Sequence, residues 1–382
     1  MSNRKQVLCL SNVPWCGKTT RRQMIMSRMR DVQIVYVDPP AGMKTAFSSK
    51  PEPFGPYAHI RVYQPTGIPK AESGLLLNGL FSRRAALAAF IESVTQKEEL
   101  ADPLLWLYSP LDVDLIGMIP HEGVVYDCAE NHLQLPTARK PGLLYQKERL
   151  LCQKADVVFA AQMSLYDRIE EFNKKTYLIP SGIDYRPKAS LSGEAIDTIA
   201  RLEELPKPIY GYAGALRRNV DFHMLNRIAD TGKGLLVVTQ TGADESAVTE
   251  EVESLTKRGN VLLIRCSAQT NILDYVSRFD VCVNPITASG SGDELNTRVF
   301  FEYLDSGKPI VTSPYPAIVR NYGDVADIVE VGDTFLQMVL TAEERYDLTR
   351  RERQLGYAKA CNWDARVSEM RRLLAREGYL VD

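Results

Sequence analysis

PIYGYAG, residues 208–214, is a short apolar run that ends in a glycine, and it follows a long segment that has no such run. That segment, YRPKASLSGEAIDTIARLEELPKP (185–208), is largely polar and ends in Pro206 and Pro208. Apolar runs of about four to eight residues between turn residues are typical of buried strands. The strand pattern therefore restarts at 208, and we place the connection between two domains just before it.

Apolar runs of the same kind occur on both sides of this connection. Before it they are QVLCLS (6–11), QIVYVD (33–38), IRVYQP (60–65), PLLWLY (103–108), GVVYDC (123–128), DVVFAA (156–161) and TYLIPS (176–181). After PIYGYAG they are GLLVVTQ (234–240), NVLLIR (260–265), DVCVNP (280–285), PIVTSP (309–314) and DIVEV (327–331). Segments with helical periodicity, such as 79–97 and 142–154, lie between many of them. Continuous apolar runs indicate parallel strands that helices cover on both faces.

The fold class that this pattern predicts is α/β, with two doubly wound, Rossmann-like domains. A chain of 382 residues is also longer than one hydrophobic core usually organises. We expect the first domain at 1–185 and the second at 206–364. Because ligands of such sheets bind beyond the carboxyl ends of the strands, we expect the active site in a cleft that the two domains face.

Composition excludes several classes of protein. The chain is 45% hydrophobic and 25% charged with a net charge of −2, which does not favour a nucleic-acid partner. It has no apolar stretch of membrane-spanning length and no signal peptide, so we expect a cytoplasmic protein. The seven cysteines form no CxxC pair and the four histidines are dispersed, so neither a disulfide framework nor a metal site is expected. Local basic clusters, such as Arg83 and Arg84, are either solvated or meet anionic lipid at the membrane.

SNVPWCGKTT (11–20) ends like the phosphate-binding loop of an NTPase. Such a loop needs a glycine where this chain has Asn12, because the backbone must turn sharply to direct its N–H groups at phosphates. Pro14 removes a backbone donor, and Trp15 would crowd a ligand that lies against the main chain. We therefore expect the match to be a coincidence, with an ATPase as an outside alternative.

The segment ITASGSGDELNTRVFFEYLDSGKPIVT (286–312) has the pattern of a helix N-terminus that binds an anion. Asp293 is a candidate N-cap, and the helix should begin near Glu294 and end at Gly307. Its first turn offers free N–H groups and the positive end of the helix dipole, and Arg298 adds a positive charge one turn further on. These features predict a diphosphate site.

Glu294, Arg298 and Glu302 are four residues apart, so they project from one face of that helix. Two interpretations stay open from spacing alone. The three side chains form a salt-bridge ladder on the protein surface, or they line a binding site.

Here the chain resembles a known family. ELNTRVFFEYLDSGKPIV (294–311) resembles the Glu-x7-Glu segment of GT-B glycosyltransferases of family 4. It is more similar still to the form NPxKxFEYLAxGKPVV of bacterial polysaccharide and teichuronic acid glycosyltransferases. Thr297 stands where proline is common, and Arg298 replaces the usual lysine; arginine also binds phosphate.

Further similarities to the same family occur in the family's order along most of the chain. They are LCLSNVPW (8–15), VVYDCAENHLQLP (124–136), KERLLCQKADVVFAAQMSLYDRI (147–169), YLIPSGID (177–184), PIYGYAGAL (208–216) and CNWDARV (361–367). The resemblance implies that the first domain binds the acceptor, where Lys18 and Thr19 could touch it, and that a last helix at about 365–382 packs back on this domain. It implies that the second domain binds the donor.

Within the donor site, the resemblance assigns Glu302 to the ribose, Arg298 to the diphosphate, and Glu294 or Asp293 to the donor sugar; we also place Asn296 there. Gly211 and Gly214 suggest a strand-to-helix turn at which the backbone approaches a diphosphate. Arg217 or Arg218 could neutralise that diphosphate, or both could simply be solvated.

Asp127 and Glu130, in YDCAEN, close a strand of the first domain. A carboxylate there could act as general base on an acceptor hydroxyl, which inverting transfer requires. A structural role for Asp127 is an equal alternative. Asp112 and Asp114 form an Asp-x-Asp motif that holds a metal in another glycosyltransferase fold; here we expect a helix start and no metal.

The sequence thus predicts a metal-independent hexosyltransferase, with UDP-sugar as the expected donor substrate and no cofactor. The expected acceptor is a polysaccharide or lipid-linked glycan, with peripheral contact to the cytoplasmic face of the membrane. A sugar-nucleotide epimerase on the same fold and a non-catalytic binding protein remain alternatives.

Overall fold

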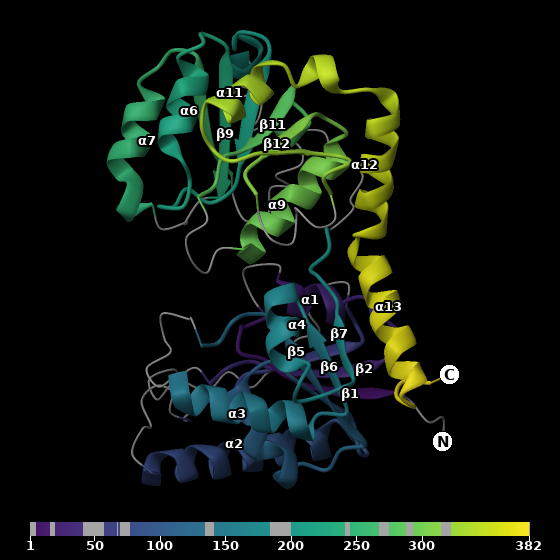
Figure 1. The fold of residues 1–382 in the computed structure, drawn as a ribbon. Coiled ribbons are helices and arrows are strands. Elements are labelled where there is room, and N and C mark those ends of the chain that lie inside the picture. The colour runs from purple at the N-terminus through teal and green to yellow at the C-terminus, as the bar shows by residue number, and fades with distance from the viewer. Residues whose placement is uncertain are drawn as a thin grey trace. The chain divides into compact units, whose positions relative to one another are not determined.

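The computed structural model has two compact α/β units, each built on one parallel sheet (Figure 1). Unit 1 comprises Met1–Pro180 and Arg366–Asp382, and unit 2 comprises Ser181–Ala365. The structure describes residues 5–15, 20–40, 57–66, 68, 77–133, 141–183, 200–240, 245–266, 275–287, 293–314 and 322–381, without the side chains of 77–82, 240 and 293–298.

The sheet of unit 1 has seven strands in the order β3-β2-β1-β4-β5-β6-β7. The strands are β1 (Gln6–Leu10), β2 (Gln33–Val37), β3 (Ile60–Tyr63), β4 (Leu104–Leu107), β5 (Gly123–Cys128), β6 (Val157–Ala160) and β7 (Thr176–Leu178). Strand order reverses between β1 and β4, and crevices for ligands form beyond the carboxyl ends of strands at such a reversal.

The helices of unit 1 lie between these strands along the chain. They are α1 (Arg21–Met26), α2 (Leu77–Lys97), the 3-10 helix η1 (Pro110–Met118), α3 (Pro141–Lys154) and α4 (Met163–Ile169). The predicted helical segments 79–97 and 142–154 correspond to α2 and α3. Ser109 caps η1 by accepting a hydrogen bond from the Leu111 N–H, so the Asp-x-Asp motif does lie at a helix start.

Unit 2 repeats this architecture with six strands in the order β10-β9-β8-β11-β12-β13. The strands are β8 (Ile209–Ala213), β9 (Gly234–Gln240), β10 (Val261–Cys266), β11 (Val281–Asn284), β12 (Ile310–Thr312) and β13 (Asp327–Ile328). Its helices are α6 (Phe222–Ala229), η2 (Ser246–Val248), α7 (Thr249–Thr256), α9 (Asp293–Ser306), α11 (Asp333–Leu340), η3 (Glu343–Arg345) and α12 (Leu348–Ala360). Strand order reverses between β8 and β11.

Every apolar run that the sequence analysis interpreted as a strand contains a strand of one of these two sheets. The central strands β4, β5, β6, β8 and β11 are buried along their whole length. Burial on both faces is the reason that their sequences are continuously apolar. The predicted α/β class with two parallel sheets is therefore confirmed.

The C-terminal residues contact the rest of unit 1 through charged and aromatic side chains. Helix α13 (Trp363–Arg376) carries Arg371, whose Nη2 donates to the Asp31 carboxylate at 2.6 Å. Beyond the helix, Glu377 pairs with Lys175 at 2.8 Å and accepts a hydrogen bond from the Tyr177 hydroxyl at 3.0 Å. The contacts of Glu377 hold the end of the chain against the edge strand β7.

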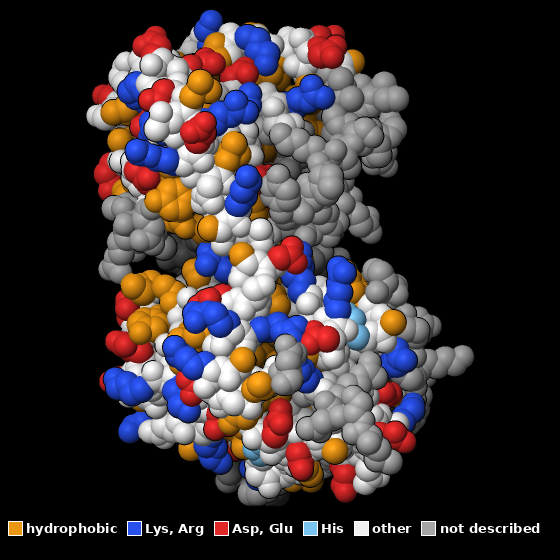
Figure 2. Space-filling model, turned by 90° about the vertical axis from the view of Figure 1, so that its right-hand side faces the viewer, with side chains coloured by type: hydrophobic (Ala, Val, Ile, Leu, Met, Phe, Trp, Pro, Cys, Tyr) orange, Lys and Arg blue, Asp and Glu red, His pale blue; other side chains and the backbone are white. Residues whose placement is uncertain are grey.

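Charges of both signs lie side by side on the visible surface of each unit (Figure 2). On α13, for example, Arg372 pairs with Glu369 at 2.7 Å. On this face, the described residues form no basic patch of a single sign of the kind that nucleic-acid binding requires. Among the described residues, no helix is both long enough and apolar enough to cross a membrane.

We predict that Gly211→Ala destabilises the protein by about 1–3 kcal/mol, the usual cost of an overpacked core. A Cβ atom at Gly211 would lie 2.0 Å from the ring of Phe279, so the ring or strand β8 would have to move. The thermal unfolding midpoint should fall. In the control Gly356→Ala, on helix α12, the new Cβ meets no atom within 4 Å, and helix propensity favours alanine. Equal midpoints for the two variants would contradict the packing argument.

Candidate functional site

In unit 2 the first candidate site element is the turn after β8. Gly214 has a φ of +147°, a conformation that side chains rarely adopt, and a Cβ there would lie 2.9 Å from the Tyr212 hydroxyl oxygen. Its N–H donates to the Val238 carbonyl on β9 at 2.9 Å. The turn thus requires glycine, and a main chain without a side chain can approach a ligand closely.

Gly211 does not share this role. It lies within β8, and the Phe279 ring occupies the space beside it. The expectation that both glycines serve the turn is therefore wrong for Gly211, whose missing side chain makes room for an aromatic ring of the core.

Helix α9 runs from Asp293 to Ser306, and Gly307 follows with a φ of +62°. The helix bounds predicted from the capping and glycine signals are confirmed to within a residue. The side chains of Asp293, Glu294, Asn296 and Arg298 lie outside the described ones, so the contacts expected of them stay predictions.

Glu302 is described, and its side chain is not on the surface. The residue is 4% exposed. Its charge raises the pKa values of Cys266, at the end of β10, and of Tyr303, although burial contributes more to both shifts. A salt-bridge ladder on the surface is therefore excluded as the explanation for Glu302, because the residue is buried.

Arg217 and Arg218 follow the glycine turn and are both exposed. This placement is compatible with a phosphate contact and equally with simple solvation. The alternatives that the sequence left open for these two arginines stay open.

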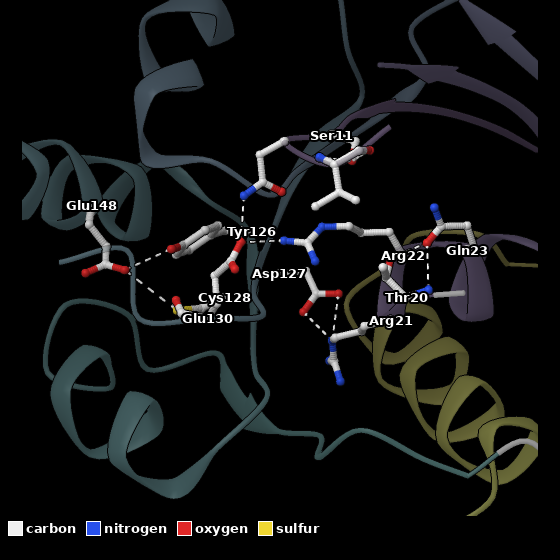
Figure 3. A network of polar contacts seen from close by, with 12 residues as sticks. Ser11, Thr20, Arg21, Arg22, Gln23, Tyr126, Asp127, Cys128, Glu130 and Glu148 are labelled. Carbon is white, nitrogen blue, oxygen red and sulfur yellow. Dashed lines mark hydrogen bonds and ion pairs between the residues drawn. The ribbon is translucent and has the colours of Figure 1, made fainter. Parts of the chain in front are cut away.

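In unit 1 the candidate residues lie in the last residues of β5 and just after it, and a buried ion pair holds Asp127 (Figure 3). Asp127 is 0% exposed, and Arg21 Nε donates to its two carboxylate oxygens at 2.9 and 3.2 Å. Arg21 Nη1 also donates to the Ile179 carbonyl at 2.7 Å. The Asp127 carboxylate thus balances a buried guanidinium group and ties β5 to α1 and to the end of β7. Between the two roles that the sequence allowed for it, this geometry supports the structural one.

Glu130 is also paired. Its Oε1 accepts hydrogen bonds from Arg22 Nη2 and from Asn12 Nδ2, each at 2.7 Å. Burial would raise the pKa of Glu130, but the charge of Arg22, the nearby His132 and these hydrogen bonds outweigh it, so the pKa lies below its usual value. A carboxylate with a lowered pKa is a poor general base.

His132 is a candidate that sequence reasoning missed. It is 5% exposed, and no hydrogen bond among the described residues reaches its Nε2. Burial lowers the pKa of His132, against the opposing charges of Glu130 and Glu148. A neutral imidazole with an open ring nitrogen can accept a hydrogen bond or a proton. Its position two residues after Glu130, behind a strand end, was the available signal.

A second set of contacts holds the segment that carries Glu130 and His132. Glu148 on α3 accepts from the Tyr126 hydroxyl at 2.9 Å and from Arg168 Nη2 at 3.1 Å. Arg168 on α4 also donates to Asn131 Oδ1 at 2.9 Å. The segment after β5 is thereby connected to two helices as well as to the sheet, which restricts the positions of its side chains.

The loop after β1 does not have the geometry of a phosphate cradle in its described part. The Trp15 N–H donates to Asp38 Oδ1 at 2.8 Å, and the Trp15 ring packs edge-on against Tyr36 with centroids 4.8 Å apart. A backbone donor that an NTPase loop would offer to phosphate is thus used by a carboxylate. Lys18 and Thr19 lie outside the described residues.

The Asp-x-Asp motif is engaged by basic side chains. Asp114 pairs with Lys147 at 2.6 Å and with Arg84 at 3.4 Å. These contacts explain its acidic side chain as part of an ion-pair cluster between η1, α2 and α3.

Known proteins are similar to this chain in sequence and in structure. A protein-family model that matches the chain was not found. TuaH of Bacillus subtilis (strain 168), assigned to teichuronic acid biosynthesis as a glycosyltransferase, is 20% identical over 276 residues, which are 68% of each chain.

Solved structures match over nearly the whole length. HepE of Anabaena in complex with UDP has a TM-score of 0.68 and 14% identity, covering 97% of this chain and 100% of HepE. The α,α-trehalose 6-phosphate synthase of Burkholderia multivorans has a TM-score of 0.69 and 11% identity, covering 98% and 99%. Both are GT-B glycosyltransferases. The chain has a GT-B fold. The fold that the resemblance implied is thus confirmed, and at these identities the likeness is one of fold.

We predict that Asp127→Asn destabilises the protein by about 3–5 kcal/mol, because it leaves the buried Arg21 charge without a counter-charge. Thermal unfolding measures this. The control Asp333→Asn removes the ion pair with Arg227, in which the Asp333 side chain is 91% exposed, and should cost about 1 kcal/mol or less. A purely catalytic Asp127 would instead give a variant as stable as the control.

We predict that Glu130→Gln destabilises the protein most at neutral pH. Because the folded pKa of Glu130 is lowered, its carboxylate stabilises the fold fully above the ordinary glutamate pKa, and this contribution is lost as pH falls through the folded pKa. Unfolding midpoints of both proteins from about pH 7 down to about pH 3 should therefore converge at the acid end. A difference that does not change with pH would contradict the ion pair.

Proposed function

We propose that this chain is a glycosyltransferase that moves a hexosyl group from a UDP-sugar to a glycan or lipid-linked acceptor. Two features of unit 2 together carry the proposal. One is the turn after β8, which requires glycine at position 214, and the other is the buried carboxylate of Glu302 on helix α9. The turn suits a diphosphate, and a buried carboxylate suits the two hydroxyl donors of a ribose.

The comparisons support a UDP-sugar as the donor. Structures of HepE contain UDP and UDP-glucose, the latter with a TM-score of 0.66 and 16% identity to this chain. Helix α9 would present its N-terminus to the diphosphate, with Arg298 nearby and Asp293, Glu294 and Asn296 toward the sugar. Arg217 would add charge from the turn after Gly214. Neither the epimerase nor the non-catalytic alternative gains support from these relatives.

In the reaction, the bond between the anomeric carbon and the diphosphate oxygen breaks, and a bond to the acceptor hydroxyl oxygen forms. The helix N-terminus and Arg298 would stabilise the charge on the leaving diphosphate without a metal ion. The acceptor hydroxyl must lose its proton. Since Asp127 and Glu130 are both ion-paired, His132 is the described unit 1 residue whose chemistry best suits contact with that hydroxyl.

The acceptor side belongs to unit 1 in this proposal, in the cytoplasm and at the inner membrane surface. Support for the membrane contact comes from exposed apolar side chains beside basic ones on unit 1. Leu143 and Leu150 on α3 are 40% and 39% exposed, and Arg149 lies next to Leu150 on the same helix. Such a surface suits the headgroups of anionic lipids.

We predict that UDP or a UDP-sugar raises the unfolding midpoint of the purified protein in EDTA, since a ligand that binds only the folded state stabilises it. The panel should include GDP, TDP, ADP and ATP. Glu302→Ala and Arg298→Ala should each weaken UDP binding about tenfold to a hundredfold, the value of a hydrogen bond to a charged group. The matched control Glu250→Ala, at an exposed position on α7, should bind as the wild type does.

Other outcomes select other functions. A response to ATP alone would overturn the proposal in favour of an NTPase. Tight UDP-sugar binding without transfer to any glycan acceptor would favour a binding protein, and interconversion of the sugar without an acceptor would favour an epimerase. Unchanged UDP affinity in both site variants would refute the assigned site.

A further inference from the structure

Tyr303 is the residue after Glu302 on α9, and its hydroxyl lies between the two central strands of unit 2. The residue is 0% exposed. Its hydroxyl oxygen accepts a hydrogen bond from the Ala213 N–H at 2.7 Å and lies 3.4 Å from the Val283 carbonyl oxygen, to which it can donate. Ala213 ends β8 and immediately precedes the Gly214 turn. A side chain of the helix thus reaches the last backbone donor before the turn.

The sheet leaves a gap at this place. Strands β8 and β11 pair only through Tyr210 with Val281 and Gly211 with Cys282 in the described register. Ala213, at the end of β8, therefore has no ladder partner on β11. A buried backbone N–H without a partner is costly, and the Tyr303 hydroxyl supplies one.

The ring of Tyr303 is held in place by aromatic packing. Phe279 contacts it edge-on, with ring centroids 6.3 Å apart. Phe279 in turn occupies the space beside Gly211, where any other residue type would place a Cβ atom. Burial raises the pKa of Tyr303 well above its usual value, so the hydroxyl keeps its proton and can both accept and donate. Neighbouring contacts thus determine where this hydroxyl lies.

We propose that Tyr303 is a positioning residue of the donor site: its hydroxyl ties the end of β8, and with it the Gly214 turn, to helix α9. The inference rests on the proposed function. The turn faces the diphosphate and Glu302 the ribose, so the hydroxyl keeps the two binding elements at a constant spacing. Loss of the hydroxyl should therefore weaken the binding of ligands that contact both elements more than the binding of ligands that contact only one.

The test is Tyr303→Phe, which removes the hydroxyl and keeps the ring. Calorimetry should show UDP binding weakened about fivefold to thirtyfold, as for a lost hydrogen bond that leaves a buried donor unsatisfied. The affinity for uridine, which lacks the diphosphate, should fall less than about threefold, roughly within the error of such a measurement. In transfer assays, the donor KM should rise while kcat changes little, because ground-state and transition-state binding fall together.

The matched control is Tyr346→Phe in the same unit. It removes the hydrogen bond from the Tyr346 hydroxyl, just before α12, to Gln354 within that helix. This variant should change the unfolding midpoint by a similar amount and leave UDP affinity as in the wild type. UDP affinity that is lowered equally in both variants would show a general effect of lost stability and overturn the inference.

Two further outcomes decide the inference. If a folded Tyr303→Phe variant binds UDP as tightly as the wild type does, the positioning role is refuted and the proposed function stands. If the wild type binds no nucleoside diphosphate, the proposed function itself is refuted. If the variant does not fold, amide hydrogen exchange of the wild type decides. UDP should then protect segments 209–216 and 299–306 together, and protection of 299–306 alone would contradict the coupling.

Discussion

The hydrogen bonds between β8 and β11 stop after Tyr210 and Gly211, and the candidate donor site depends on that gap. Where the order of strands reverses, neighbouring strands lead to opposite sides of the sheet, so their ends separate and the main chain becomes accessible to a ligand. The Gly214 turn lies just beyond this point. The Tyr303 hydroxyl satisfies the backbone groups that the separation exposes, and the adjacent Glu302 belongs to the same helix turn.

The corresponding edge of unit 1 has a different chemistry. Two adjacent arginines of α1 each pair with a carboxylate at the end of β5: Arg21 pairs with Asp127, in the strand, and Arg22 pairs with Glu130, just after it. Buried ion pairs contribute little net stability because each charge loses its hydration, but removal of one partner is costly. The arrangement therefore fixes charge at a strand end. His132, whose pKa is lowered by burial, lies near Glu130 as a group that can interact with a hydroxyl.

Much of the local structure could be predicted from sequence. GVVYDC became β5 and DVCVNP became β11, because a run of apolar side chains is stable only where both faces of a strand are covered. The bounds of α9 followed from a polar start and a terminal glycine. Side-chain partners could not be predicted in this way. Arg21 and Asp127 are 106 residues apart, and no pattern in either segment indicates the other.

The sequence by itself determined the two parallel sheets, the ends of the main helices and the need for glycine at the turn after β8. Each of these depends on residues a few positions apart, through side-chain periodicity and backbone conformation. Only the tertiary structure decided that Asp127 balances a buried arginine, that Gly211 makes room for Phe279 and that Tyr303 bridges the end of β8 to α9. The physical reason is that burial, charge pairing and hydrogen bonding depend on which distant segments are brought together when the chain folds.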